Sequence, residues 1–300
     1  MRDEGKQLST NWRISPGSGQ LARLARKRVL ARNIFLYAVV VAVSALMFFP
    51  MVWMFYTSLK TNNEIYASAW ALPEVPQFGN FPKAWRVGHL GRYVWNSIVC
   101  TSTSVFAIVA LSSLAAFAFS RLTFRGRDLL FALFLLGLII PVQIVLIPLY
   151  SAMAQAGLQN TRTSVILPYI AWGLPLSIYI LRAFFLTLPV ELEDAARIDG
   201  CGTFGVFWRI LLPLVKPGIA TVTIFSSLGI WNEVLLAFVF LKDDLLKTLP
   251  LGLYAFYGYH ITDLSLLFAA LTVVTVPMIV LFLIFQRQLI EGLTVGSLKG

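Results

Sequence analysis

Long apolar runs dominate this sequence, and several reach the roughly 20 residues that a helix needs to cross a bilayer. Hydrophobic residues make up 58% of the 300 residues and charged residues only 13%, whereas soluble domains contain about 25% charged residues. Because a backbone in lipid must satisfy its own hydrogen bonds, the runs predict an all-α, polytopic membrane protein. Six transmembrane helices are expected, at about residues 34–58, 94–119, 129–150, 164–187, 217–241 and 264–286.

Basic residues beside the ends of these runs indicate which side each end faces. The chain carries 24 Lys and Arg against 14 Asp and Glu. Lys and Arg are concentrated in three segments: the N-terminal tail, the segment between the second and third runs, and residues 182–216. With six spans, all three segments lie on the same side of the membrane. The positive-inside rule makes that side cytoplasmic. We expect residues 1–33 to form a basic cytoplasmic tail near anionic lipid, residues 34–300 to form the transmembrane domain, and both termini to be cytoplasmic.

The first apolar run is longer than the core of a cleaved signal peptide, so we expect it to be retained. Nucleic-acid binding is not expected, because no aromatic residues interleave the basic cluster for base stacking. The two histidines and two cysteines offer no metal-ligand spacing. The sequence contains no G-x-x-x-x-G-K-[ST] phosphate-binding loop, so we expect neither ATP hydrolysis nor a bound cofactor in this chain.

A polar segment separates the fourth predicted span from the fifth. It reads ELEDAARIDGCGTFGVFWRILLP and covers residues 191–213. Acidic residues in its first turn complement the positive end of a helix dipole, and Gly200 supplies a helix stop. We therefore expect a short helix over about 189–199, with an ion pair between Glu193 and Arg197, four residues apart.

After the glycine, Thr203 can cap a second helix with a wide apolar face, and the fifth span follows. The first helix is too polar to cross lipid and too acidic to rest on anionic lipid. Its adjacent Ala195 and Ala196 leave a small-residue surface that permits close approach of another protein. The pattern predicts a helix that docks on a protein partner at the cytoplasmic surface.

The spacing of this segment resembles the EAA loop of ABC-importer permeases. Asp194-Ala195-Ala196 is followed after three residues by Gly200, and after nine more by Ile210-Leu211-Leu212-Pro213. Aspartate replaces the glutamate of the family pattern. Further segments resemble carbohydrate-importer permeases of the maltose-type "G" subunit branch: Asn96-Ser97, Ser120-Arg121-Leu122, Trp231-Asn232-Glu233 and the C-terminal residues 292–300.

This resemblance implies a permease subunit of an ATP-binding-cassette importer, in a bacterial or archaeal cytoplasmic (inner) membrane. The chain would form half of a pathway for a sugar or oligosaccharide, in a heterodimer with a second permease subunit. ATP and Mg²⁺ would be bound by a separate ATPase dimer, and an extracytoplasmic solute-binding protein would deliver the solute. The loop of about 188–216 would carry the coupling helix, and the residues expected to dock on the ATPase are Glu191, Glu193, Asp194, Ala195, Ala196, Arg197, Asp199 and Gly200.

Glu233 is the conspicuous ionisable residue within a predicted span, where charges line a cavity or meet a partner. Trp231, Asn232 and Glu233, with Gln143, are candidates for lining the sugar pathway. Asn232 and Glu233 could instead form hydrogen bonds between helices or across the permease dimer, and the sequence leaves both readings open.

Two other classes of function fit the sequence less well. A stand-alone secondary transporter of a small solute would require inverted repeats with paired broken helices, which the sequence does not show. A membrane-embedded enzyme would require a convergent nucleophile, base or metal set, which the two histidines do not supply. The substrate itself is not fixed by any residue pattern.

Overall fold

The computed structural model describes residues 18–256 and 263–297, and within these ranges every regular element is a helix. The chain divides into two units, Met1–Trp53 and Met54–Gly300. The first unit contains most of helix α1 (Ser18–Thr57), whose apolar part, Leu30–Thr57, is 28 residues long and can cross a membrane. The helix begins within the predicted basic tail, and residues 1–17 of that tail lie outside the described residues.

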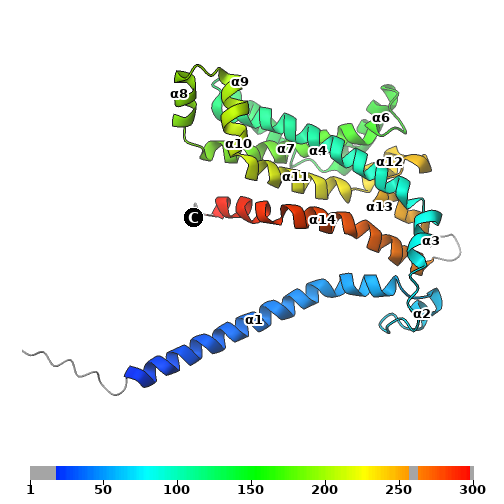
Figure 1. The fold of residues 1–300 in the computed structure, drawn as a ribbon. Helices are drawn as coiled ribbons and strands as arrows, with labels where there is room; N and C mark the ends of the chain where they lie inside the picture. Colours follow the sequence, from blue (N-terminus) through cyan, green and yellow to red (C-terminus); the bar gives the residue numbers. More distant parts are fainter. Residues whose placement is uncertain (1–17, 257–262, 298–300) are drawn as a thin grey trace, which may run out of the picture. The chain divides into compact units, whose positions relative to one another are not determined.

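The second unit is built around four long helices: α4 (Leu90–Arg121), α7 (Thr163–Thr187), α11 (Lys216–Trp231) and α14 (Leu264–Ser297). Helix α4 packs along α7 and α11, and α11 packs along α14 (Figure 1). All four sequences are rich in the apolar residues that the predicted spans required. The structure thus confirms an all-helical membrane protein.

The number of separate spans differs from the predicted six. Four helices in the described part of the chain can cross a membrane by length and composition: Leu30–Thr57, α4, α7 and Leu264–Ile284. A fifth is reached if Thr203–Leu214 and Lys216–Trp231, bent by 74°, are counted as one span.

The predicted span 129–150 is broken into α5 (Arg127–Leu136) and α6 (Val142–Gln155). Proline at position 141 has no N–H to donate and is extended, with ψ 135°, so the first helix cannot run into the second. The predicted span 217–241 is likewise two helices, α11 and α12 (Leu235–Phe240).

Short elements gather at the two ends of the second unit. One end carries α2 (Asn62–Ala67), α3 (Asn80–Val87), α12 and α13 (Leu249–Gly252), with 3-10 turns η2 (Asp244–Leu246) and η3 (Leu253–Phe256). The opposite end carries α8 (Glu191–Ile198), α9 (Thr203–Gly205), the π-helical segment η1 (Val206–Leu211) and α10 (Leu212–Leu214). Figure 1 shows these groups at opposite ends of the α4–α7 pair.

Buried hydrogen bonds hold the end that carries η2 and α13. The Nδ2 of Asn96 donates to the carbonyls of Leu245 and Lys247, both at 2.9 Å, and its Oδ1 accepts from Arg162 at 2.8 Å. The hydroxyl of Ser97 accepts from the backbone N–H of Leu249 at 2.7 Å. The Asn96-Ser97 pair noted in the sequence therefore fastens the loop after α12 to the first turns of α4.

Candidate functional site

Helix α8 is the centre of the candidate site, and its sequence explains both of its ends. Three acidic residues occupy its first turn, where they stabilise the helix dipole. Gly200 has φ +84°, a left-handed conformation that glycine adopts without steric cost. The N–H of Cys201 donates to the Ala196 carbonyl and that of Gly200 to the Arg197 carbonyl, the Schellman pattern of a helix C-terminus. The predicted short helix and its glycine stop are confirmed.

The chain after the glycine forms a second helical segment and then bends. Helix α9 begins at Thr203, but Gly202 occupies the cap position and makes no side-chain cap hydrogen bond, so the prediction of Thr203 as the cap is wrong. Residues 203–214 continue through η1 and α10 and meet α11 at an angle of 74°. The resulting order is helix, glycine elbow, helix and membrane helix.

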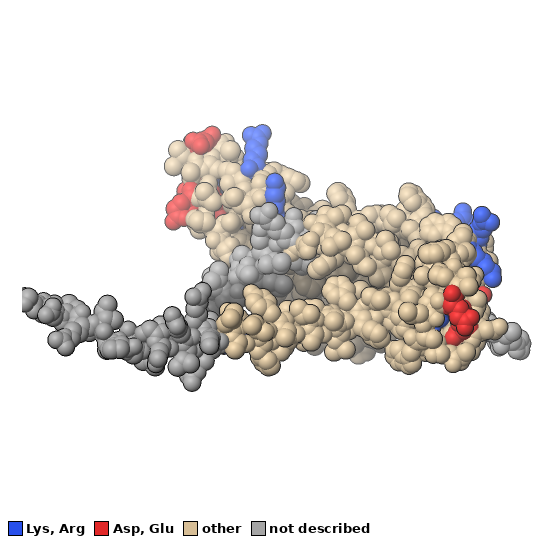
Figure 2. Space-filling model, turned by 60° about the horizontal axis from the view of Figure 1, so that its bottom comes forward, with Lys and Arg blue, Asp and Glu red and all other residues tan. Residues whose placement is uncertain are grey.

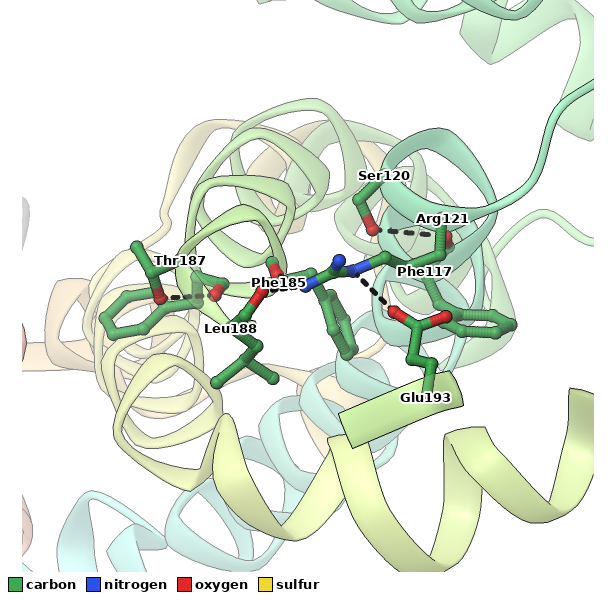
Figure 3. Close-up of polar contacts among 8 residues, drawn as sticks. Phe117, Ser120, Arg121, Phe185, Thr187, Leu188 and Glu193 are labelled. Atoms are coloured by element: carbon green, nitrogen blue, oxygen red, sulfur yellow. Dashed lines mark hydrogen bonds and ion pairs between the residues drawn. The ribbon is translucent and has the colours of Figure 1, made fainter. Parts of the chain in front are cut away.

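Glu193 does not pair with Arg197 as predicted. Its Oε1 lies 3.1 Å from Nε of Arg121, at the end of α4, and the two side chains are 6% and 7% exposed (Figure 3). Opposite charges attract more strongly in a buried site than in water, whereas an exposed pair four residues apart contributes only about 0.2–0.5 kcal/mol. Arg197 is exposed, and no ion pair joins it to Glu193 in the described residues.

The Arg121 guanidinium also closes the end of α7. Its Nη2 donates to the carbonyl of Phe185 and, at 2.6 Å, to that of Leu188. The last carbonyls of a helix have no partner within the helix, and a cation there is favoured by the helix dipole. One side chain from α4 therefore contacts both α7 and α8, as Figure 3 shows. In the sequence, Arg121 belongs to a family motif and to the basic segment after the second apolar run, and neither pattern indicates its partners. A basic residue at the end of an apolar run was the available signal.

Apolar packing completes this end of the unit. The ring of Phe117 on α4 lies 5.0 Å from that of Phe207 on η1 and 6.1 Å from that of Phe185 on α7, measured between centroids. Ala196 of α8 is buried in the same cluster. These contacts set α8 and η1 on the ends of α4 and α7.

The predicted docking residues divide into two groups by burial. Glu193 and Ala196 face the interior of their own chain, so they are not free for direct contact with a partner. The remaining six are exposed: Glu191, Asp194, Ala195, Arg197, Asp199 and Gly200. Exposed apolar side chains lie nearby, with Ile198 86%, Phe204 71% and Trp208 57% exposed. Together these residues offer a partner both charge and apolar surface.

The four predicted pathway residues do not meet in one cavity. Glu233 borders a cavity of about 350 Å³ that is also lined by Tyr169, Trp172 and Ser177. Trp231 is 6% exposed and borders a different cavity, of about 450 Å³. Gln143 and Asn232 are exposed and line neither of these cavities.

Glu233 lies in the break between α11 and α12 and accepts a hydrogen bond from another helix, as one of the two interpretations expects. Its Oε2 accepts from the Tyr169 hydroxyl on α7 at 2.8 Å. Its two oxygens also accept from the backbone N–H groups of Leu236 and Ala237, at the start of α12. A carboxylate there satisfies N–H groups that have no partner within the helix. The Asn232 side chain donates to the Leu228 carbonyl of its own helix at 2.9 Å.

Comparison with known proteins supports the resemblance seen in the sequence. Residues 107–295 match the family described as "Binding-protein-dependent transport system inner membrane component". The chain belongs to this family. The match includes α8, the glycine elbow and the Arg121–Glu193 contact, so the site described above lies within the part that defines the family.

Two relatives and one solved structure match most of this chain. The permease is 38% identical to the probable ABC transporter permease protein YurM of Bacillus subtilis, over 89% of this chain and 87% of that protein. It is 36% identical to the melibiose/raffinose/stachyose import permease protein MelC of the same organism, over 93% and 100%. A bacterial ABC transporter for import of the acidic polysaccharide alginate contains a chain of the same fold, with TM-score 0.76 and 19% identity, covering 87% of this chain and 97% of that one.

The permease is thus a membrane-embedded subunit of an ABC importer. The reading as a stand-alone secondary transporter is not favoured by the family or by these relatives.

Proposed function

We propose that the permease forms half of the pathway for a sugar or oligosaccharide and couples to a separate ATPase through residues 191–213. The substrate class is supported by MelC, named for import of melibiose, raffinose and stachyose, and by the alginate importer that shares the fold. The coupling role rests on one observation: α8 is a capped helix, held on the ends of α4 and α7, whose outward face carries charged residues. A partner that moves such a helix can move the transmembrane helices with it.

ATP and Mg²⁺ are bound by the ATPase subunits in this proposal, because the permease has no phosphate-binding loop. The exposed residues Glu191, Asp194, Ala195, Arg197, Asp199 and Gly200 contact the ATPase. Glu193 and Ala196 act indirectly, by fixing α8 to the permease. The chain binds no metal or cofactor of its own.

The assembly includes a second permease subunit and an extracytoplasmic solute-binding protein, and the family's description as binding-protein-dependent supports the latter. We place the protein in the cytoplasmic (inner) membrane of a bacterium or archaeon, with α8 and both termini on the cytoplasmic side. Basic residues near α8, including Arg209 and Lys216, support this orientation through the positive-inside rule.

The pathway itself is proposed to involve the cavity beside Glu233. Tyr169, Trp172 and Ser177 line it together with Glu233, and they offer hydroxyl and aromatic groups to a sugar. Gln143, Trp231 and Asn232 remain predictions as pathway residues, and none of the three lines this cavity.

Substitution of Gly200 by tryptophan tests the coupling role. Gly200 has φ +84°, a conformation that is strained for any L-residue with a side chain, and a bulky side chain there would protrude from the exposed surface beside α8. We expect Gly200→Trp to lose co-purification of the ATPase and ATP-driven uptake of radiolabelled raffinose by membrane vesicles that contain the full importer.

Gly157→Trp is the matched control, because Gly157 also has a positive φ, +68°, and nothing lies within 4 Å of the position that a Cβ would take there. It should leave ATPase association unchanged. Retention of both ATPase binding and uptake in Gly200→Trp would contradict the docking proposal. Failure of the intact importer to take up raffinose, maltose or any other tested sugar would contradict only the substrate class.

A further inference from the structure

Besides the backbone at its two ends, helix α8 can transmit motion only through the side chains that fasten it to the rest of the permease. Within the described residues, it places two side chains in the interior, Glu193 and Ala196. Ala196 contributes one methyl group to the apolar cluster, whereas Glu193 reaches the guanidinium of Arg121. We propose that the Arg121–Glu193 pair transmits displacement of α8 to the ends of α4 and α7, and that Arg121 is a positioning residue for coupling. This inference rests on the docking function proposed above.

Arg121 is suited to this role because it joins three helices: it belongs to α4, and its guanidinium contacts α7 and α8. It belongs to the last turn of α4, donates to the Phe185 and Leu188 carbonyls at the end of α7, and faces Glu193 of α8. The guanidinium is planar and rigid, so its donors keep a fixed geometry relative to one another. Displacement of the carboxylate therefore acts on both membrane helices at the same point.

The pair resists separation because each charge depends on the other. Arg121 Nε and Glu193 Oε1 are buried, and neither has an aligned hydrogen-bond partner in the described part of the chain, so their 3.1 Å contact is one of charge. If α8 moved away alone, a charge would be left in a site that water barely reaches, at a large cost in free energy. Movement of α8 together with α4 and α7 avoids that cost.

The backbone gives two further routes from α8. Toward α7 only residues 188–190 intervene, and this link does not reach α4. Toward η1 the chain passes through the elbow at Gly200 and Gly202, where nothing lies within 4 Å of the position that a Cβ would take. Beyond the elbow, η1 is held by apolar contacts such as Phe117 with Phe207, which are non-directional. The Arg121–Glu193 pair bypasses the elbow and links α8 directly to α4.

Hydrogen–deuterium exchange on the complete importer in nanodiscs tests this link without knowledge of the solute. The probe is ATP with vanadate, compared with the nucleotide-free state. In the unaltered protein we expect nucleotide to change exchange in residues 191–198 and also in 117–122 and 183–188. In Glu193→Gln and Arg121→Gln, the change in 191–198 should remain, whereas the change at the ends of α4 and α7 should fall about five-fold or more.

Arg125→Gln is the matched control, because Arg125 lies close in sequence but is exposed and has no ion-pair partner in the described part of the chain. It should behave like the unaltered protein. If a single variant does not assemble, the double variant Arg121→Gln/Glu193→Gln, which leaves no orphaned charge, should show the same loss at α4 and α7.

Full retention of the nucleotide effect at 117–122 and 183–188 in an assembled variant would overturn the proposal. A purely structural role would alter yield or baseline exchange but not remove the nucleotide effect selectively. Absence of any nucleotide effect on 191–198 in the unaltered importer would overturn the docking function, and this inference with it.

Discussion

Arg121 and Glu193 place two opposite charges where less than a tenth of either side chain is exposed. Such a pair is weak evidence for net stability, because desolvation offsets much of the attraction. Removal of only one of the two charges is strongly destabilising, because the remaining charge keeps its desolvation cost and loses its partner. At the residue scale, the pair therefore behaves as a fixed unit, and single substitutions in it should be far more harmful than joint ones.

We predict that Glu193→Ala lowers the free energy of unfolding of the permease by about 3–5 kcal/mol, because it orphans the Arg121 charge. Glu191→Ala, in the same turn but exposed, should change it by no more than about 0.5 kcal/mol. Chemical denaturation in detergent micelles, followed by tryptophan fluorescence, measures both. Equal effects of the two substitutions would show that the Glu193 carboxylate is not held as described.

At the scale of elements, hydrogen bonds from α4 fix the loop at the end opposite α8. The N–H of Leu249 is the first of helix α13 and has no acceptor within that helix. The Ser97 hydroxyl supplies the acceptor in a buried site. The Asn96 side chain donates to the carbonyls of Leu245 and Lys247, which precede α13. The start of α13 thus depends on side chains from a helix far away in the sequence.

Ser97→Ala should therefore free the Leu249 amide and cost about 1–3 kcal/mol, the price of an unsatisfied buried donor. Hydrogen exchange at residues 247–252 should become faster. Ser102→Ala on the same helix is the matched control, because Ser102 is exposed and its hydroxyl donates to the Val99 carbonyl within α4. Equal exchange in the two variants would contradict the assigned role of Ser97.

Some of these elements could be predicted from the sequence and others could not. The long helices α4, α7 and α14 follow from uninterrupted apolar runs, and the end of α8 follows from Gly200. The breaks at Pro141 and after Trp231 were missed, because apolar residues continue on both sides of them. The Arg121–Glu193 contact was missed for another reason: it depends on how α4 and α8 meet in space, and a local rule pointed to Arg197 instead.

At the scale of the molecule, charge is distributed as a membrane subunit requires. On the face drawn in Figure 2, charged side chains lie at the two ends, and the band between them carries no described charged side chain. Helix α8 belongs to one of these ends, and the loop held by Asn96 and Ser97 to the other. A force applied to α8 therefore enters the second unit at one end, through α4 and α7, both of which extend toward the opposite end.

The most direct measurement is photo-cross-linking from the outer face of α8 in the complete importer. Benzoylphenylalanine in place of Ala195, which is exposed on α8, should cross-link to the ATPase subunit. The same group in place of Phe238, 67% exposed on α12 at the other end, should not. Cross-links from position 195 to lipid or to the solute-binding protein, with none to the ATPase, would contradict the account.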